Sequence, residues 1–371
     1  MKHQEDKMIA EPASVVTNPP RQWGPSAPPT IYPDPDVIIV DPAFADLVVG
    51  LTSIRRLWTG SRWAEGPAWS GQGQYLVFSD VHTDTQYRYL WETGEVTAFR
   101  KPSYHSNGNT FDFQGRQIGT QDFHRRVVRW EHDGSMTVIA DSFDGKPLNS
   151  PNDLVPHPDG SIWFTDPPYG ARLLEGHADF AGGPANPDGR LNPLVGQADA
   201  GAIGGKRREL PTNTYRWDPS GRLDLVVSEE QVPDPNGLCF SPDYKTLYLV
   251  STGKGPGDKV GGKGVIFAFD VDGEKLTNQR LFSDMMVDGV KCGPDGMRVD
   301  VQGNLWSASS APLGYAGVTV WNPAGKLIGR IRLPEVCANV AFGGPKRDHL
   351  FMTASQSLYV LQVSTQGATP G

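Results

Sequence analysis

Cysteine is scarce in this chain, and its placement indicates neither a disulfide framework nor a metal site. Only Cys239, Cys292 and Cys337 occur in 371 residues, an odd number without metal-type spacing. Small secreted domains that rely on disulfides are much richer in cysteine. We therefore expect three buried small side chains in a reducing compartment, and we predict a cytoplasmic protein.

Long apolar runs and an excess of positive charge are also missing. No segment approaches the roughly 20 apolar residues that span a bilayer. The first residues, MKHQEDKMIAEPASVV, lack the apolar core of a secretory signal. The net charge of −8 leaves no basic face for phosphate backbones. We expect neither membrane nor nucleic acid as a partner.

Glycine and proline, by contrast, are abundant, with 43 and 32 residues beside 10 tryptophans. This composition favours many short strands joined by tight turns. Residues 1–47 form a separate Pro-rich N-terminal extension, because a stretch such as NPPRQWGPSAPPTIYPDPD suits neither a helix nor a central strand. We expect an extended arm that packs across the domain or bridges to a second subunit, so a homo-oligomer through this arm stays open.

Residues 48–371 contain an internal repeat. A turn followed by an apolar strand occurs six times, in SGQGQYLVFSD, DFQGRQIGTQD, HPDGSIWFTD, SPDYKTLYLVST, VQGNLWSASS and GPKRDHLFMTAS. A hairpin pattern such as TYRWDPSGRLDLVV follows each of the first five, whereas the sixth has only SLYVLQV. The missing partner is available in SIRRLWTG, residues 53–60.

These repeats predict an all-β fold, a six-bladed β-propeller with four-stranded antiparallel blades. The last blade is closed by the N-terminal strand. A β-sandwich with coincidental turns is the alternative, but two independent elements repeating in register favour the propeller.

A polar residue begins each blade, eight or nine positions before its turn. These residues are Glu65, Asn107, Asn152, Asn236, Asp295 and Asn339. First strands line the channel of a propeller, so we expect the six side chains to form one ring. Carboxylate and amide oxygens suit a divalent metal, Ca²⁺ foremost, although Zn²⁺, Mn²⁺, Mg²⁺ and Fe²⁺ also accept oxygen ligands. For Asn107 and Asn339, bonding to backbone groups at strand ends is an equal alternative.

The substrate pocket should lie on the same face as this ring, because the loops between second and third strands return there. An insertion at about 171–210 belongs to that face, where it forms a lid or a disordered decoration. Position alone makes five residues candidates for the pocket: His105, His124, Asp166, Tyr169 and Tyr315. A structural role is the alternative for each.

At these residues the chain resembles the family of senescence marker protein, gluconolactonase and luciferin-regenerating enzyme. AEGPAW, LNSPNDLV, DGSIWFTDPPYG, PNGLCFSPD and PDGMRVD look like that family's motifs in its order, over about residues 60–360. The bacterial gluconolactonase branch is the most similar. The resemblance implies a six-bladed propeller, a divalent ion in the channel mouth and lactone hydrolysis.

Carried over by position, Glu65, Asn236 and Asp295 match the family's metal ligands. Asn152 matches an Asn that joins the ion or holds substrate, and Asp295 also matches the residue credited as general base. Ser150 stands where animal members carry a sugar-binding Arg, which puts the substrate in doubt.

The sequence therefore predicts a metal-dependent lactonase, with a small-molecule lactone as partner and Asp295 as catalytic base. Asp153 or His105 could share the task of the base. Substrate-binding candidates are His105, Asn107, Asn152, Asp166 and Tyr169. Two alternatives stay open: a phosphoester hydrolase of the diisopropylfluorophosphatase type, and a non-catalytic interaction propeller.

Overall fold

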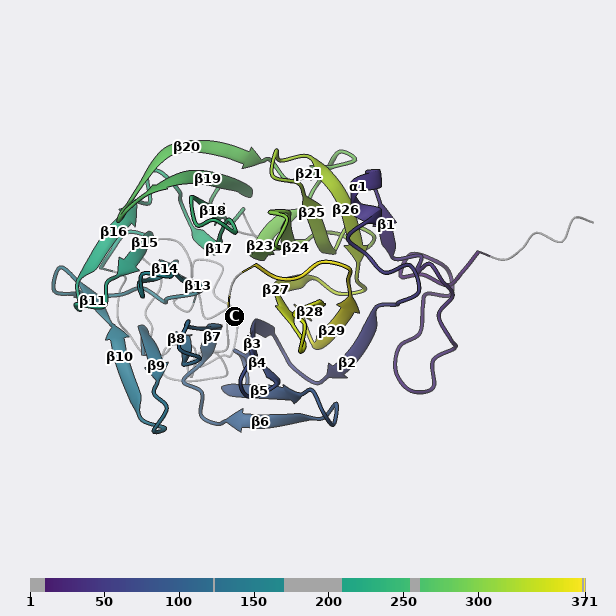
Figure 1. Cartoon of the computed structure of the whole chain (residues 1–371), viewed down its shortest axis with the longest axis horizontal. Coiled ribbons are helices and arrows are strands. Elements are labelled where there is room, and N and C mark those ends of the chain that lie inside the picture. The colour runs from purple at the N-terminus through teal and green to yellow at the C-terminus, as the bar shows by residue number, and fades with distance from the viewer. Residues whose placement is uncertain (1–10, 123, 170–208, 254–260, 369, 371) are drawn as a thin grey trace, which may run out of the picture.

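The computed structural model describes residues 11–122, 124–169, 209–253, 261–368 and 370. Six antiparallel sheets surround one axis, as Figure 1 shows, with the first strand of each sheet nearest the centre. The predicted six-bladed propeller is confirmed. The suggested lid at 171–210 lies almost entirely outside the described residues.

Four blades are built from consecutive strands. The first comprises β3 (Ala64–Ser70), β4 (Tyr75–Asp80), β5 (Thr85–Leu90) and β6 (Val96–Arg100). The second comprises β7 (Ser106–Phe111), β8 (Gln117–Gln121), β9 (Arg126–Trp130) and β10 (Met136–Ala140). The third comprises β13 (Leu154–Pro156), β14 (Ile162–Asp166), β15 (Asn213–Trp217) and β16 (Leu223–Val227). The fourth comprises β17 (Pro235–Phe240), β18 (Thr246–Ser251), β19 (Val265–Asp272) and β20 (Lys275–Ser283).

The last two blades borrow strands from the N-terminal region. Blade five contains β23 (Gly293–Val299), β24 (Leu305–Ser310), β25 (Gly317–Trp321), β26 (Leu327–Arg332) and, as a fifth strand, β1 (Val37–Ile39). Blade six contains β27 (Cys337–Gly343), β28 (His349–Ala354), β29 (Ser357–Gln362) and β2 (Arg55–Thr59). The predicted closure by residues 53–60 is therefore confirmed. Two short hairpins lie outside the blades: β11 (Ser142–Phe143) with β12 (Lys146–Pro147), and β21 (Met286–Val287) with β22 (Val290–Lys291).

The N-terminal extension contains more regular structure than its proline content indicates. Besides β1, it forms a one-turn helix, α1 (Pro42–Ala45), with Asp41 as the N-cap and Pro42 in the first turn. In Figure 1 this region lies beside blades five and six. The buried guanidinium of Arg21 donates to the Ile54 carbonyl at 2.7 Å, and Asp36 pairs with Arg332 of blade five at 3.2 Å. These contacts hold the arm to the domain.

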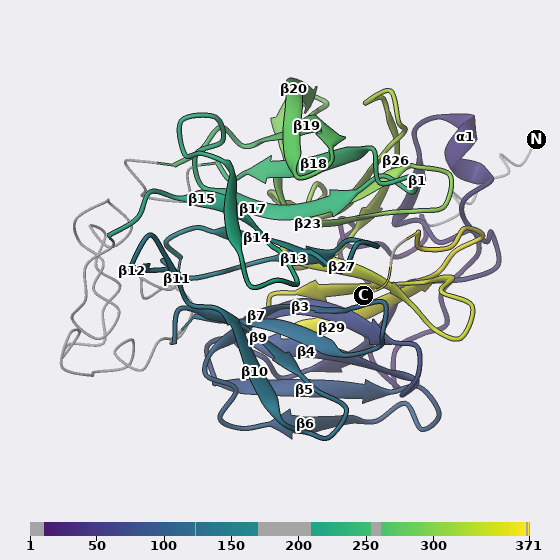
Figure 2. The same ribbon diagram turned by 60° about the vertical axis from the view of Figure 1, so that its left-hand side comes forward.

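Apolar residues from neighbouring blades pack between the sheets, which explains why inner and second strands are buried along nearly their whole length. Cys239, Cys292 and Cys337 are all buried and free, which confirms the expectation for their packing. Figure 2 shows the same sheets turned by 60° about the vertical axis. In the described part of the chain, no helix has the length and hydropathy needed to cross a membrane.

Candidate functional site

In four of the six blades, the polar residue near the start of the inner strand sits at an irregularity in strand pairing. Pairing of β3 with β4 is regular up to Glu65 and shifts register before Ala68. The same shift occurs at Asn107 in blade two, Asn236 in blade four and Asp295 in blade five. A β-bulge breaks the alternation of a strand and re-aims a side chain. The strands therefore start on polar residues because these positions point out of the regular pleat.

A glycine follows four of these residues and lets adjacent inner strands approach closely. A Cβ atom on Gly66 would lie 2.0 Å from the Asn107 carbonyl oxygen, and one on Gly237 would lie 2.2 Å from that of Asp295. The backbone N–H of Gly108 donates to the Asn152 carbonyl at 2.9 Å. The backbones at Glu65 and Asn107, at Asn107 and Asn152, and at Asn236 and Asp295 are thus adjacent in space.

Contacts across the axis show how narrow the channel is. Nδ2 of Asn339, on blade six, lies 3.4 Å from Oδ2 of Asp153, which precedes β13 on the opposite blade. Arg298, on blade five, approaches the same carboxylate at 3.6 Å, and the Asp153 and Arg298 side chains are almost fully buried. Side chains from three blades therefore meet at the centre.

Both ring carboxylates act on a third residue. Burial raises the pKa of the Cys337 thiol well above its ordinary value, and the negative charges of Asp295 and Glu65 raise it further. Cys337 begins the inner strand of blade six, which lies between blades five and one. The two carboxylates thus flank this strand and share one electrostatic environment.

The orientation of two candidate ligands is defined by hydrogen bonds. Oε2 of Glu65 accepts from the Gly66 N–H at 2.9 Å. Nδ2 of Asn236 donates to Oγ1 of Thr252 at 3.0 Å, so its carbonyl oxygen faces away from Thr252. Glu65 and Asn236 are buried, whereas Asp295 is partly exposed.

The donor set of the ring consists of two carboxylates and several amides. In the described ranges, no group of three or more His, Cys, Asp or Glu side chains is arranged as a metal site. Of the six ring residues, only Glu65 and Asp295 belong to these four residue types. Asn152 and Asn236 offer amide oxygens in addition. This chemistry is that of an oxygen-rich site for a hard cation.

Two asparagines of the ring also serve the fold. The backbone carbonyl of Asn107 accepts from Ser79 Oγ at 2.9 Å and from Asn109 Nδ2 at 3.1 Å. The Asn339 Oδ1 accepts from the Val340 N–H at 2.8 Å, in addition to the contact of its Nδ2 with Asp153. The alternative that these amides satisfy strand ends therefore describes Asn339 well.

His105 lies directly before β7, two residues from Asn107. Its backbone has a positive φ of 51°, and its N–H donates to Asp84 at 2.8 Å. Nδ1 lies 2.7 Å from the Val81 carbonyl, which favours the tautomer with the proton on Nδ1. This arrangement leaves Nε2 as the acceptor nitrogen of the ring.

The other pocket candidates have different surroundings. Asp166 is 0 % exposed, and its carboxylate accepts from the Asn149 N–H at 2.8 Å. The Tyr169 hydroxyl donates to the Asp234 carbonyl at 3.4 Å and so links the loop after β14 to blade four. His124 is exposed and packs against Tyr104, while Tyr315 lies under the Arg330 guanidinium. Asp166 thus supports the segment that leads to Asn152.

Arg298 was not singled out in the sequence, although it stands inside the quoted motif PDGMRVD. It lies on β23, and its buried guanidinium approaches the Asp153 carboxylate at 3.6 Å. A cation at that position could have been expected from the buried Asp153, because a buried carboxylate requires a partner.

The chain is similar to several known proteins. The profile of the SMP-30/gluconolactonase/LRE-like region matches residues 63–356. A gluconolactonase of Zymomonas mobilis is 28 % identical, over 85 % of this chain and 83 % of its own. Pentonolactonase XacC of Haloferax volcanii is 26 % identical, over 82 % and 86 %. The structure of a gluconolactonase from Xanthomonas campestris, 30 % identical, superimposes with a TM-score of 0.70, covering 88 % of this chain and 94 % of that one.

Proposed function

The chain belongs to the SMP-30/gluconolactonase/LRE-like family, and from that premise we propose that it hydrolyses a sugar lactone with the help of a divalent cation. Relatives named gluconolactonase and pentonolactonase, which cover most of this chain, support the substrate class. The observation that carries the proposal is that β3 and β23, the inner strands that carry Glu65 and Asp295, both pack against β27, the inner strand of blade six.

The cation would be held by Glu65, Asn236 and Asp295, with Asn152 completing the set. The donor chemistry fits, since two carboxylates offset the charge of a dication and amide oxygens add ligands without repulsion. Ca²⁺ is the first choice by this argument. When bound, the ion would supply Lewis acidity toward the lactone carbonyl oxygen.

Asp295 is assigned the role of base. It is the most accessible residue of the ring, whereas Asp153 is buried and contacts Arg298 and Asn339. Its carboxylate takes a proton from water as the water oxygen attacks the carbonyl carbon. The acyl–oxygen bond of the lactone then breaks, and the proton passes to the departing ring oxygen, which gives a hydroxy acid.

His105, Asn107 and Asn152 are proposed to hold the hydroxyl groups of the sugar. The acceptor nitrogen of His105 and the amide groups of the asparagines suit such contacts. Asp166 and Tyr169 were expected to touch substrate as well. Given their bonds to Asn149 and Asp234, we assign them to shaping the pocket wall.

The test is a hydrolysis assay with several aldonolactones, in which the released protons are measured in a weak buffer. The protein is first treated with a chelator, and each divalent metal is then added back singly. We expect activity only with metal, and a loss of about 10²- to 10⁴-fold in kcat for Asp295→Asn. Asp272→Asn, an exposed position on β19, is the matched control. Full activity without metal would refute the scheme, and faster cleavage of a fluorophosphate would favour the phosphoester alternative.

A further inference from the structure

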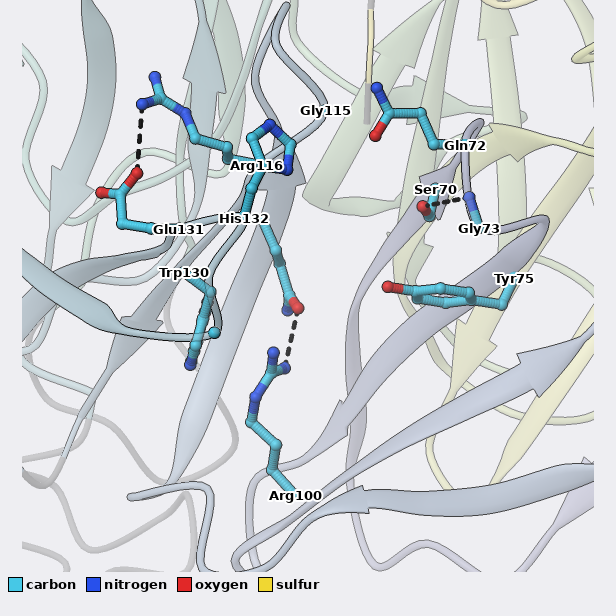
Figure 3. A pocket seen from close by; sticks show the side chains of 12 residues that line it. Ser70, Gln72, Gly73, Tyr75, Arg100, Gly115, Arg116, Trp130, Glu131 and His132 are labelled. Carbon is cyan, nitrogen blue, oxygen red and sulfur yellow. Dashed lines mark hydrogen bonds and ion pairs between the residues drawn. The ribbon is translucent and has the colours of Figure 1, made fainter.

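A second cleft opens on the opposite face of the propeller, between blades one and two. Its volume is about 550 Å³, and Figure 3 shows its walls. The rim is formed by the hairpin turns after β3, β7 and β9, which lie at the far ends of these strands from the polar ring. The lining includes Gln72, Tyr75, Arg100, Arg116, Trp130 and Glu131.

Arg100 is the central cation of this cleft and is held rigidly. Its guanidinium lies between two rings, 4.1 Å from the centroid of Phe99 and 4.0 Å from that of Trp130. Nη1 donates to the side-chain oxygens of Gln86 and Gln117, the latter at 2.8 Å. Both faces and one nitrogen are therefore committed, and the remaining edge carries Nε and Nη2.

The arginines around the cleft differ in their ion pairs. Arg116 pairs with Asp112 at 2.8 Å and with Glu131 at 3.2 Å, and Arg129 also pairs with Glu131. For Arg100, no carboxylate lies within ion-pair distance among the residues that the structure describes. Burial lowers the pKa of Arg100 to about 10, and the proximity of Tyr75 offsets part of this effect.

The amides behind Arg100 fix its position relative to the domain. Nε2 of Gln117 donates to Asn109 Oδ1 at 3.0 Å, and Gln86 donates to the same oxygen at 2.8 Å. Asn109 in turn donates to the Gly66 carbonyl at 2.9 Å. A buried network of amides thus holds the guanidinium in one orientation. An incoming anion can therefore bind without the entropy cost of ordering this side chain.

We propose that this cleft is a binding site for a small hydroxylated carboxylate, bound through the free edge of Arg100. A planar guanidinium edge matches a carboxylate with two parallel hydrogen bonds. The rings of Trp130 and Tyr75 offer apolar walls for C–H groups, and the Gln72 amide can bond hydroxyl groups. The proposal does not depend on lactone hydrolysis at the polar ring.

The test is calorimetric titration of the full chain with D-gluconate, with acetate, inorganic phosphate and glucose as comparison probes. We expect gluconate to bind at a site that Arg100→Lys weakens by roughly tenfold or more, because lysine keeps the charge but loses the fork. Gln72→Glu should weaken it similarly by placing a carboxylate in the cleft. Gln72 is exposed, so this variant should fold even if Arg100→Lys does not.

Gln302→Glu provides the matched control, since it makes the same charge change at an exposed turn of blade five. Its affinity for gluconate should equal that of the wild type. Gln72→Glu should not change the affinity of the polar ring for gluconate, so binding at the ring can be distinguished from binding in the cleft. The proposal is overturned if the wild type and Gln72→Glu bind gluconate equally, or if phosphate binds as tightly as gluconate.

Discussion

Gly296 and Asn339 lie so close that a Cβ atom on the glycine would be 1.9 Å from the Cγ of the asparagine. Both residues belong to inner strands, of blades five and six, and the asparagine also reaches Asp153 across the axis. The packing of the ring therefore depends on the absence of a side chain at position 296.

The first prediction concerns this contact. Gly296→Ala should destabilise the protein by about 1–3 kcal/mol, since neither the inner strand nor the buried amide can yield freely. Chemical unfolding measures the change. Gly50→Ala is the control, because no atom lies within 4 Å of its added Cβ. Equal stability of the two variants would mean that the inner strands separate easily.

The second prediction concerns the hydrogen bond between Asn236 and Thr252. Thr252→Val keeps the shape of the side chain but removes the acceptor for Nδ2 of Asn236. If Asn236 is a ligand, we expect metal affinity to fall about 10- to 100-fold, as for other residues that orient metal ligands. Calorimetric titration with Ca²⁺ measures it. Unchanged affinity would argue against Asn236 as a ligand.

The third prediction concerns the attachment of the N-terminal arm. Arg21 pairs with Asp34 and Asp36 and donates to the Ile54 carbonyl at 2.7 Å. Arg21→Ala leaves two buried carboxylates without this partner, so we expect a loss of about 3–5 kcal/mol in unfolding free energy. The exposed Arg62 provides the control: Arg62→Ala should change stability little. A similar small effect for Arg21→Ala would show that the arm contributes little to stability.

The fourth prediction concerns acid sensitivity at a hairpin turn. Oδ1 of Asp133 accepts from the Ser135 hydroxyl at 2.6 Å and from the Ser135 N–H at 2.9 Å. These bonds lower the pKa of Asp133 below its ordinary 3.8. Its contribution to stability is therefore present above pH 3.8 and is lost as the pH falls through the lower folded value.

Asp133→Asn keeps the acceptor oxygen but does not titrate in this range. We expect the advantage of the wild type over this variant to shrink as the pH is lowered from about 5 to about 2. The urea concentration at the midpoint of unfolding, measured for both proteins across this pH range, tests the expectation. A constant difference would show that the bonds to Ser135 do not favour the ionised form.

The blades could be predicted from the sequence because each repeats two local signals, an alternating strand and a turn. The extra strand β1 was not predicted. Its residues Val37–Ile39 follow a Pro-rich stretch, and pairing with β26 is a contact between segments nearly 300 residues apart. The ring of polar side chains stays a prediction from spacing. The bulges at four of its positions were not predicted, since a bulge depends on the partner strand.

The candidates at the pocket were the least predictable. Asp166 is the last residue of β14, and only its full burial and its bond to Asn149 reveal a supporting role. Arg298 and Arg100 were not predicted because the role of each depends on neighbouring side chains from other strands. A charged residue in a strand pattern does not reveal whether its partner is a carboxylate, an aromatic ring or a ligand.

The closure of blade six has a consequence for biosynthesis. β2 is made early, yet its partner β29 ends at Gln362, close to the end of the chain. The hydroxyl of Thr52 donates to the Gln362 carbonyl across 310 positions of sequence. During translation β2 therefore lacks its partner strand until the residues of β29 have been made. The circle is completed only when the last strand emerges.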